Sequence, residues 1–271
     1  MPPPKTVTLK DPVTFRYIGK RVPRLDSPAK VSGQAEFGLD VRRPDMLFAT
    51  VARAPVFGAK LASFDDRAAR AAPGVVDVRQ VPSGVAVIAK NTYAARKGRD
   101  ALETKWDLGP GATFSTEQLA ADYRKLAMTP GPAVAASIGD APSALARGRH
   151  VVEAVYEVPF LAHACMEPLN CVAHVTDNHC DVWTGTQWQS GDQLNAAKAL
   201  GFEPGQVSIH TTFLGGGFGR RGDAQSLVFR HAVCRAESAR DVAHDGEHRA
   251  AAVVALDRPY AHGVRGQLLH R

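Results

Sequence analysis

The sequence predicts an α+β fold. Short apolar runs between turn residues occur before residue 108 and again after residue 150, and they indicate β-strands in two regions. Helical patterns lie between these runs, the longest from Asn91 to Glu103, with alanines on one side and arginine and lysine on the other. A chain of 271 residues has room for one or two domains with a sizeable core.

Residues 22–107 contain the elements of a compact α+β domain, which follows a proline- and lysine-rich linker at residues 1–21. The Val85–Ala89 run is continuously apolar, as expected for a strand covered on both faces. A short helix is expected from Asp65 to Ala72, because Pro73 and Gly74 then end it. The strands predicted in this region are Leu47–Ala52, Val75–Val81, Val85–Ala89 and Lys105–Asp107.

A second, β-rich region extends over residues 108–226, after the turn at residues 109–111. Its first helix is expected to have Thr116 as N-cap and to end near Leu126. A further helix, Gly191–Leu200, joins two of the strands. The strands predicted here are Val151–Pro159, Asn170–Val175, Cys180–Thr184 and Val207–Phe213.

The composition changes after residue 226. Residues 223–271 contain seven arginines, no lysine and five of the ten histidines, whereas residues 1–222 contain ten lysines. No apolar period is sustained there, so residues 227–271 are expected to form an atypical tail outside the cooperative fold. A shifted or truncated reading frame would explain this change, and a genuine divergent ending is the alternative.

The stretch Leu214–Arg221 carries the clearest functional signal. It places four glycines and two arginines directly after an alternating strand pattern. Glycine allows the backbone to approach an anion closely, successive N–H groups can form a concave anion site, and arginines supply donors for phosphate. The stretch predicts a loop for an anionic cofactor, and a tight turn with an exposed basic tip is the alternative.

Three blocks of the second region, in this order and spacing, resemble the molybdenum-binding subunit of the xanthine dehydrogenase/aldehyde oxidase family, in its isoquinoline 1-oxidoreductase beta-subunit branch. These blocks are Val158–Cys171, Trp183–Gln189 and Leu214–Arg221. In the first region, Arg24–Gly38, Ala72–Val75 and Gly84–Ala89 look like that family's hammerhead domain. The resemblance covers about residues 11–226. It implies a hammerhead domain at 22–107, followed by part of a molybdopterin-binding domain at 108–226.

The resemblance also implies a cofactor, molybdenum held by molybdopterin cytosine dinucleotide. Gln187 matches the family glutamine whose amide hydrogen-bonds the apical oxygen on molybdenum, and an amide can donate there without adding charge. The glycine–phenylalanine–glycine segment of the loop matches backbone amides that face the metal ligands and the pterin. The two arginines are expected to bind the phosphates or the cytosine dinucleotide extension. The cofactor-binding residues implied are Gln187, Gly215, Gly216, Gly217, Phe218, Gly219, Arg220 and Arg221.

The implied family reaction hydroxylates an N-heterocycle or oxidises an aldehyde, with water as the oxygen source. Electrons then leave through iron–sulfur clusters on a partner, a small [2Fe-2S] alpha-type subunit, with a cytochrome c as a further candidate partner. His163 and Glu167 are expected beside the substrate funnel, although Glu167 before Pro168 also suits a buried ion-pair partner. The family's catalytic base is a glutamate in a later Gly-Glu motif that this chain lacks. No catalytic residue is therefore assigned, and the chain is expected to be a central fragment, inactive alone.

Two other functions stand as alternatives. One is a non-catalytic remnant of the same subunit. The other is a dinucleotide-binding module, because residues 217–222 spell G-x-G-x-x-G after a strand. Such a module needs a following helix, a second strand and an acidic residue, and residues 223–271 offer no clean helix or strand pattern.

Charge and composition exclude further classes. The net charge of +6 and a pI near 9.3 favour anionic ligands or an acidic partner, but no basic run indicates nucleic-acid binding. No apolar stretch approaches 18 residues, so no membrane span is expected. No metal site is predicted from the cysteines, whose spacing fits neither zinc nor iron–sulfur patterns. The start has no signal-peptide pattern, so the compartment stays an open question: cytoplasmic is the default, whereas full-length relatives are usually exported to the periplasm. The cysteines are Cys165, Cys171, Cys180 and Cys234.

Overall fold

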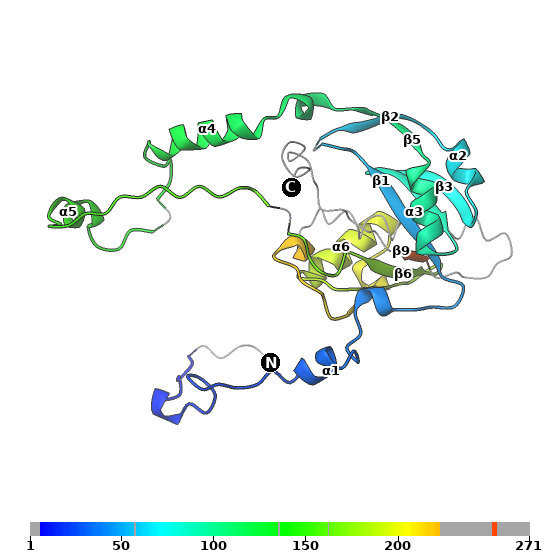
Figure 1. The fold of residues 1–271 in the computed structure, drawn as a ribbon. Helices are drawn as coiled ribbons and strands as arrows, with labels where there is room; N and C mark the ends of the chain where they lie inside the picture. The colour runs from blue at the N-terminus through cyan, green and yellow to red at the C-terminus, as the bar shows by residue number, and fades with distance from the viewer. Residues whose placement is uncertain (1–5, 57, 135, 162, 223–250, 254–271) are drawn as a thin grey trace.

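The computed structural model describes residues 6–56, 58–134, 136–161, 163–222 and 251–253. It confirms the predicted α+β class, with a seven-stranded sheet, a two-stranded ribbon and helices packed on the sheet (Figure 1). The sheet has the order β3-β4-β1-β9-β6-β7-β8, and the ribbon pairs β2 with β5. The strands are β1 Leu47–Arg53, β2 Lys60–Asp65, β3 Val75–Val81, β4 Gly84–Ala89, β5 Glu103–Asp107, β6 Cys171–Val175, β7 Cys180–Thr184, β8 Val207–Thr211 and β9 Ala251–Val253. Among the helices in these ranges, none is long and apolar enough to cross a membrane.

The first half of the sheet is antiparallel, with β4 between β3 and β1. All six residues of β4 are buried, which confirms the coverage of both faces predicted from its apolar run. Helix α3 (Thr92–Asp100) packs on β1 and β4, and α2 (Arg67–Ala71) packs beside it. Asn91 begins α3, because its side chain accepts a hydrogen bond from the Ala94 N–H at 2.8 Å. This helix ends before Glu103, where the sequence predicted its end, because that residue already belongs to β5.

The second half of the sheet combines an antiparallel hairpin, β6–β7, with a parallel pair, β7–β8. A parallel pair needs a crossover, and α6 (Gln189–Leu200) provides it. Helix α6 ends at Gly201, whose φ of 69° is the left-handed conformation that glycine adopts at low cost. These elements confirm the predictions to within two residues. The apolar side of α6 covers one face of these strands in a core of buried residues: Leu47, Ala49, Ile88, Cys171, Ala173, Val175, Cys180, Val182, Ala196, Ala197 and Val207.

Strand β9 joins the two halves of the sheet. Its backbone pairs in parallel with β1 and antiparallel with β6, and the Cα partners of Ala251 are Leu47 and Ala173. The prediction that all residues from 227 onward lie outside the fold is therefore wrong for Ala251–Val253. The rest of the predicted tail lies outside the described residues. As a result, one sheet continues across residue 107, where the sequence suggested a domain boundary.

Residues 109–166 form an arm that projects from the sheet (Figure 1). It holds the 3-10 turn Gly109–Thr113, helix α4 (Thr116–Ala127) and helix α5 (Ala141–Ala146). The N-cap of α4 is Ser115, one residue before the predicted Thr116, because the Ser115 Oγ accepts a hydrogen bond from the Gln118 N–H at 3.2 Å.

The predicted strand Val151–Pro159 is wrong. The segment is assigned to no strand and its residues are exposed, because no neighbouring strand in the described part of the chain pairs with it. It contacts α4 only through side chains. Arg124 Nη2 lies 2.8 Å from Glu157 Oε2, and the Tyr123 and Phe160 rings meet edge to face with centroids 6.2 Å apart.

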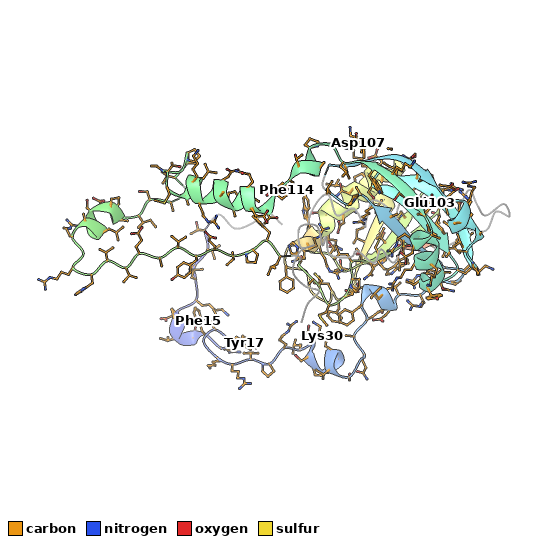
Figure 2. All side chains as sticks on the ribbon, turned by 45° about the horizontal axis from the view of Figure 1, so that its top comes forward. Phe15, Tyr17, Lys30, Glu103, Asp107 and Phe114 are labelled. Atoms are coloured by element: carbon orange, nitrogen blue, oxygen red, sulfur yellow. The ribbon has the colours of Figure 1, made fainter. Side chains whose placement is uncertain are left out.

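Residues 6–35 form a second extended segment, which contains the 3-10 turn Pro12–Thr14 and helix α1 (Ser27–Val31). Figure 2 shows Phe15 and Tyr17 on this segment and Phe114 on the arm, away from the sheet. The segment reaches the sheet at Phe37, which bridges Phe213 just after β8. The start of the chain is thus tied to the strand that leads into the glycine-rich loop.

Replacing Gly98 with alanine should destabilise the fold. Alanine is the better helix former by about 1 kcal/mol. A Cβ at this position, however, would lie 2.6 Å from Val75 Cγ2 and 2.8 Å from Val87 Cγ1. We expect Gly98→Ala to lower the free energy of unfolding by about 1–3 kcal/mol, measured by denaturant unfolding. Arg96→Ala, on the exposed side of the same helix, should change it by less than about 0.5 kcal/mol, and a stabilised Gly98→Ala would contradict the close helix–sheet contact.

Removing the Thr50 hydroxyl should also destabilise the fold. Thr50 is buried in β1, and its Oγ1 donates to the Ala95 carbonyl of α3 at 3.0 Å. Thr50→Val keeps the shape but removes this donor, so unfolding should become easier by about 1–2 kcal/mol in the same assay. Thr129→Val is the matched control, because its hydroxyl also bonds a backbone carbonyl, at 2.8 Å, but in an exposed position. Equal effects at the two sites would show that burial of the Thr50 bond is unimportant.

Candidate functional site

Three segments meet at one edge of the sheet: residues 165–170, residues 185–188 and the glycine-rich loop, residues 214–222. The carboxyl ends of β7 and β8 lie side by side because the two strands are parallel, so the loops that follow them share this edge. Backbone hydrogen bonds join the three segments, from Glu167 N to Gly215 O at 3.0 Å and from Gln187 N to Arg221 O at 3.1 Å. The family order of the motifs and the helix between them predict that Gln187 and the loop converge, and the structure places them in hydrogen-bond contact.

Gln187 is tied to the glycine-rich loop through its side-chain oxygen. Oε1 accepts hydrogen bonds from the N–H groups of Gly219 at 3.0 Å and Arg221 at 3.3 Å. The side chain is exposed, and within the described ranges its Nε2 donates to no protein acceptor. The amide is therefore fixed at one end and presents its two donors at the other.

The turn that carries Gln187 is held by the start of α6. The Thr186 hydroxyl donates to the Asp192 carboxylate and accepts from the Trp188 N–H at 2.9 Å, which anchors the residues on both sides of Gln187. Burial raises the pKa of Asp192, and the Thr186 hydrogen bond opposes part of that shift. A Cβ on Gly191 would lie 2.4 Å from the Trp188 ring, so the ring packs directly on the helix backbone. Sequence reasoning missed Thr186 and Asp192, although an acidic residue in the first turn of a helix was a usable signal.

Glu167 and Arg221 form a buried ion pair, with Arg221 Nη2 2.9 Å from Glu167 Oε2 and side chains only 2% and 7% exposed for Arg221 and Glu167. The guanidinium also donates to three backbone carbonyls, those of Gly216 at 2.8 Å, Gly185 at 3.3 Å and Glu167 at 3.0 Å. Arg221 was expected to bind cofactor phosphates. Its placement does not support that role, because its donors face inward and bond protein acceptors.

The carboxylate of Glu167 is equally engaged. Oε1 accepts from Asn170 Nδ2 at 2.9 Å and from the Leu39 N–H at 3.3 Å. Oε2 accepts from the Gly215 N–H at 2.9 Å in addition to Arg221. Of the two roles considered for Glu167, this arrangement supports the buried ion-pair partner and not the substrate funnel. Asn170 was missed as a site residue, since nothing in its spacing distinguishes it from a turn asparagine.

The loop backbone has the shape of an anion site. Gly216, Phe218 and Gly219 have φ of 97°, 52° and 87°, so the residues on either side of Gly217 have positive φ. Gly217 is buried, and a Cβ there would lie 2.4 Å from Gln187 Oε1. The N–H groups of Gly216, Gly217 and Phe218 bond no acceptor within the described residues. Gly217 is the buried member of the three, Gly216 is half-buried and Phe218 is exposed. Buried N–H groups are nearly always paired in native proteins, so the open N–H of Gly217 is the one that points to a ligand.

The remaining predicted residues are not drawn into this arrangement. His163 is exposed, and Arg220 is half-buried in the 3-10 turn Arg220–Gly222. Cys165 lies at the edge of the site, with its Sγ 3.7 Å from the Gly217 carbonyl. In the described part of the chain no three His, Cys, Asp or Glu residues are grouped so as to hold a metal ion. Burial raises the pKa of Cys180 to about 12, as expected for an inert core thiol.

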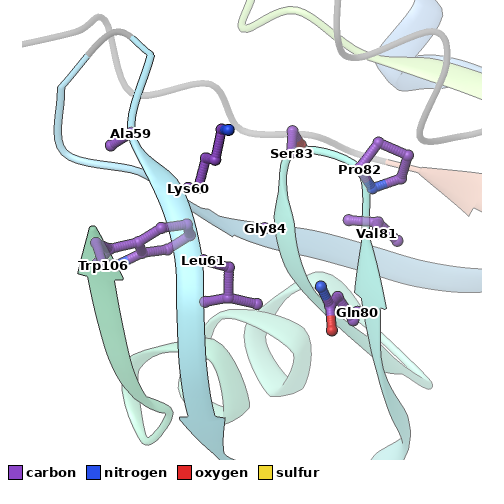
Figure 3. A pocket seen from close by; sticks show the side chains of 9 residues that line it. All are labelled: Ala59, Lys60, Leu61, Gln80, Val81, Pro82, Ser83, Gly84 and Trp106. Atoms are coloured by element: carbon purple, nitrogen blue, oxygen red, sulfur yellow. The ribbon is translucent and has the colours of Figure 1, made fainter. Parts of the chain in front are cut away.

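A separate pocket of about 370 Å³ opens between the ribbon and the β3–β4 hairpin (Figure 3). Trp106 and Lys60 stand on the ribbon side, and Gln80 and Pro82 on the hairpin side. None of its lining residues belongs to the candidate site. Apart from β9, the continuation that a dinucleotide-binding module would need, after residue 222, lies outside the described residues.

Comparison with known proteins relates this chain to molybdopterin-binding subunits. Residues 127–243 match the molybdopterin cofactor-binding domain, so the match extends beyond residue 226, where the sequence suggested the domain's end. The isoquinoline 1-oxidoreductase subunit beta of Brevundimonas diminuta is 35% identical over 85% of this chain and 31% of its own length. The nicotine 6-hydroxylase large subunit of Paenarthrobacter nicotinovorans is 26% identical over 78% of this chain and 31% of its own.

Solved structures show the same fold. Quinoline 2-oxidoreductase from Pseudomonas putida 86 matches with a TM-score of 0.61 and 20% identity, over 87% of this chain and 34% of that one. Aldehyde oxidoreductase from Desulfovibrio gigas matches with a TM-score of 0.60 and 18% identity, over 85% of this chain and 29% of that one. The chain therefore belongs to the xanthine dehydrogenase family of molybdenum-binding subunits, and it spans about a third of the length of the relatives it matches.

Proposed function

We propose that Gln187 and the glycine-rich loop form the face of a molybdopterin site that contacts the metal ligands. The observation that carries this proposal is the set of unpaired donors at one place. The N–H groups of Gly216, Gly217 and Phe218 and the Gln187 Nε2 have no acceptor among the described residues. Such donors suit oxygen and sulfur ligands that carry negative charge.

Each group contributes placement and electrostatics. Because the Gln187 Oε1 is held by two loop N–H groups, its Nε2 can donate to an oxygen ligand without an added charge. The loop amides add dipoles that need no rearrangement on binding. When bound, the molybdenum cofactor supplies the hydroxylation chemistry of the family, with water as the oxygen source.

We propose water-dependent hydroxylation of an N-heterocycle or oxidation of an aldehyde, in line with the names of the nicotine- and aldehyde-oxidising relatives. The cytosine dinucleotide form of the cofactor, with Arg220 near its phosphates, and a small [2Fe-2S] partner subunit, with a cytochrome c as a further partner, belong to the same proposal. A non-catalytic remnant of the same subunit is the second candidate, and a turnover measurement distinguishes the two.

The cofactor site should be visible by titration. We expect isolated molybdopterin cytosine dinucleotide, added anaerobically in excess to the ¹⁵N-labelled chain, to shift the amide signals of Gly216–Gly219 and the Gln187 side chain. Gly217→Ala should weaken binding about tenfold or more, about 1.4 kcal/mol, because its Cβ would collide with Gln187. Gly205→Ala, where a Cβ meets nothing within 4 Å, is the matched control. Shifts elsewhere in the chain, or none, would refute the assignment of the loop.

The purified chain alone should retain little cofactor and show no turnover. A third of a subunit supplies only part of the contacts that hold a large cofactor. We expect far less than one molybdenum per chain by elemental analysis, and no oxidation of an N-heterocycle or aldehyde with a dye acceptor. Stoichiometric molybdenum together with turnover would contradict both this expectation and the non-catalytic alternative.

A further inference from the structure

We infer that Glu167 and Arg221 are positioning residues that hold the glycine-rich loop in its binding conformation before any ligand arrives. The inference rests on the proposed function only for what the loop binds. The role follows from where the partners of the pair lie. Both residues belong to the motifs from which a substrate or phosphate contact was expected, and neither side chain reaches the open donors of the loop.

The pair connects all three segments of the site. Arg221 lies at the end of the loop, yet it bonds the Gly216 carbonyl near the loop's start, and its other donors reach the Gly185 and Glu167 carbonyls. Glu167 in turn accepts from the Gly215 N–H. The loop is therefore closed on itself through one guanidinium and clamped to the neighbouring segment through one carboxylate.

The loop needs such a clamp. Glycines have more conformational freedom to lose than other residues, and this stretch has three of them in a row before Phe218. Phe218 is held at φ 52°, which is unfavourable for an aromatic residue, although its side chain is 75% exposed and gains little from packing. The local sequence does not favour the observed shape, so the contacts of Arg221 and Glu167 select it.

The pair also sets the charge beside the open donors. A buried carboxylate next to Gly215 would repel an anionic ligand if it stood alone. Arg221 at 2.9 Å neutralises it, so the donors of residues 216–218 face no net negative charge from Glu167. Loss of Arg221 should therefore reduce anion affinity both by loosening the loop and by exposing the ligand to this charge.

Amide hydrogen exchange of the full chain tests the inference. The amides to follow are Gly219, Arg220 and Gln187, which are hydrogen-bonded within the site but are not partners of the two side chains under test. We expect Arg221→Met to speed their exchange about tenfold or more, and Arg221→Lys to do so less, because lysine keeps the charge but lacks the planar fork. Exchange in β6 and β7 should stay near that of the unmodified chain.

Matched variants of an exposed pair serve as controls. Arg124 and Glu157 are 58% and 52% exposed, so Arg124→Lys and Glu157→Gln make chemically similar changes outside the site, and neither should alter loop exchange. Glu167→Gln, which keeps the side-chain volume, should speed loop exchange as Arg221→Lys does. Unchanged exchange in Arg221→Met and Glu167→Gln would overturn the inference. An equal rise in the loop and in β6 and β7, or a failure of all three variants to fold, would also overturn it, since the pair would then support the whole core.

Titration with isolated molybdopterin cytosine dinucleotide separates this inference from the proposed function. If the unmodified chain binds the cofactor and Arg221→Met weakens binding at least about tenfold, with Arg221→Lys between them, both stand. If the unmodified chain binds no cofactor, the proposed function fails, while a faster loop exchange in Arg221→Met still supports the positioning role. If Arg221→Met binds as tightly as the unmodified chain, the positioning role fails.

Discussion

The parallel pairing of β7 with β8 is the constraint on which the candidate site depends. Its register, from Cys180 with Val207 to Thr184 with Thr211, makes both strands leave the sheet at the same edge. The chain after β7 must then present Gln187 before it turns into α6, and the chain after β8 becomes the glycine-rich loop beside it. A change of register would separate these segments, so the core under α6 specifies the site even though it contributes no functional group.

Near this strand pair, the site contains a buried ion pair. The side chain of Arg221, in the glycine-rich loop, forms this ion pair with Glu167 of the neighbouring segment, where the loop backbone would otherwise be free to move. Every polar atom of the pair has partners among backbone groups, which is the condition under which a buried ion pair is tolerated. The open N–H donors of the loop, in contrast, have no such partners. The ion pair therefore serves the structure at this edge, whereas the open donors are available to a ligand.

Much of this could be predicted from the sequence, and the failures have physical causes. The apolar run of β4 and the helical patterns of α3 and α6 are local signals, and the structure has a strand and two helices there. The segment 151–159 alternates like a strand but has no neighbour to pair with among the described residues, and alternation cannot report on a partner. The family order of the motifs, together with the helix that joins them, predicted that Gln187 lies beside the loop. Whether Arg221 faces a ligand or the interior depends on Glu167, which is distant in sequence, so spacing alone could not decide it.

Because β9 lies between β1 and β6, its position determines the order in which the fold can be completed. Without residues 251–253, β1 and β6 would each be a sheet edge with unpaired backbone groups, because β9 is their neighbour on that side. Each half can form early from its own hairpin, but the halves become one sheet only after the last described strand has been synthesised. Until then the nascent protein has two unpaired sheet edges, at β1 and β6. Edge-to-edge association between copies competes there with the insertion of β9, a strand only three residues long.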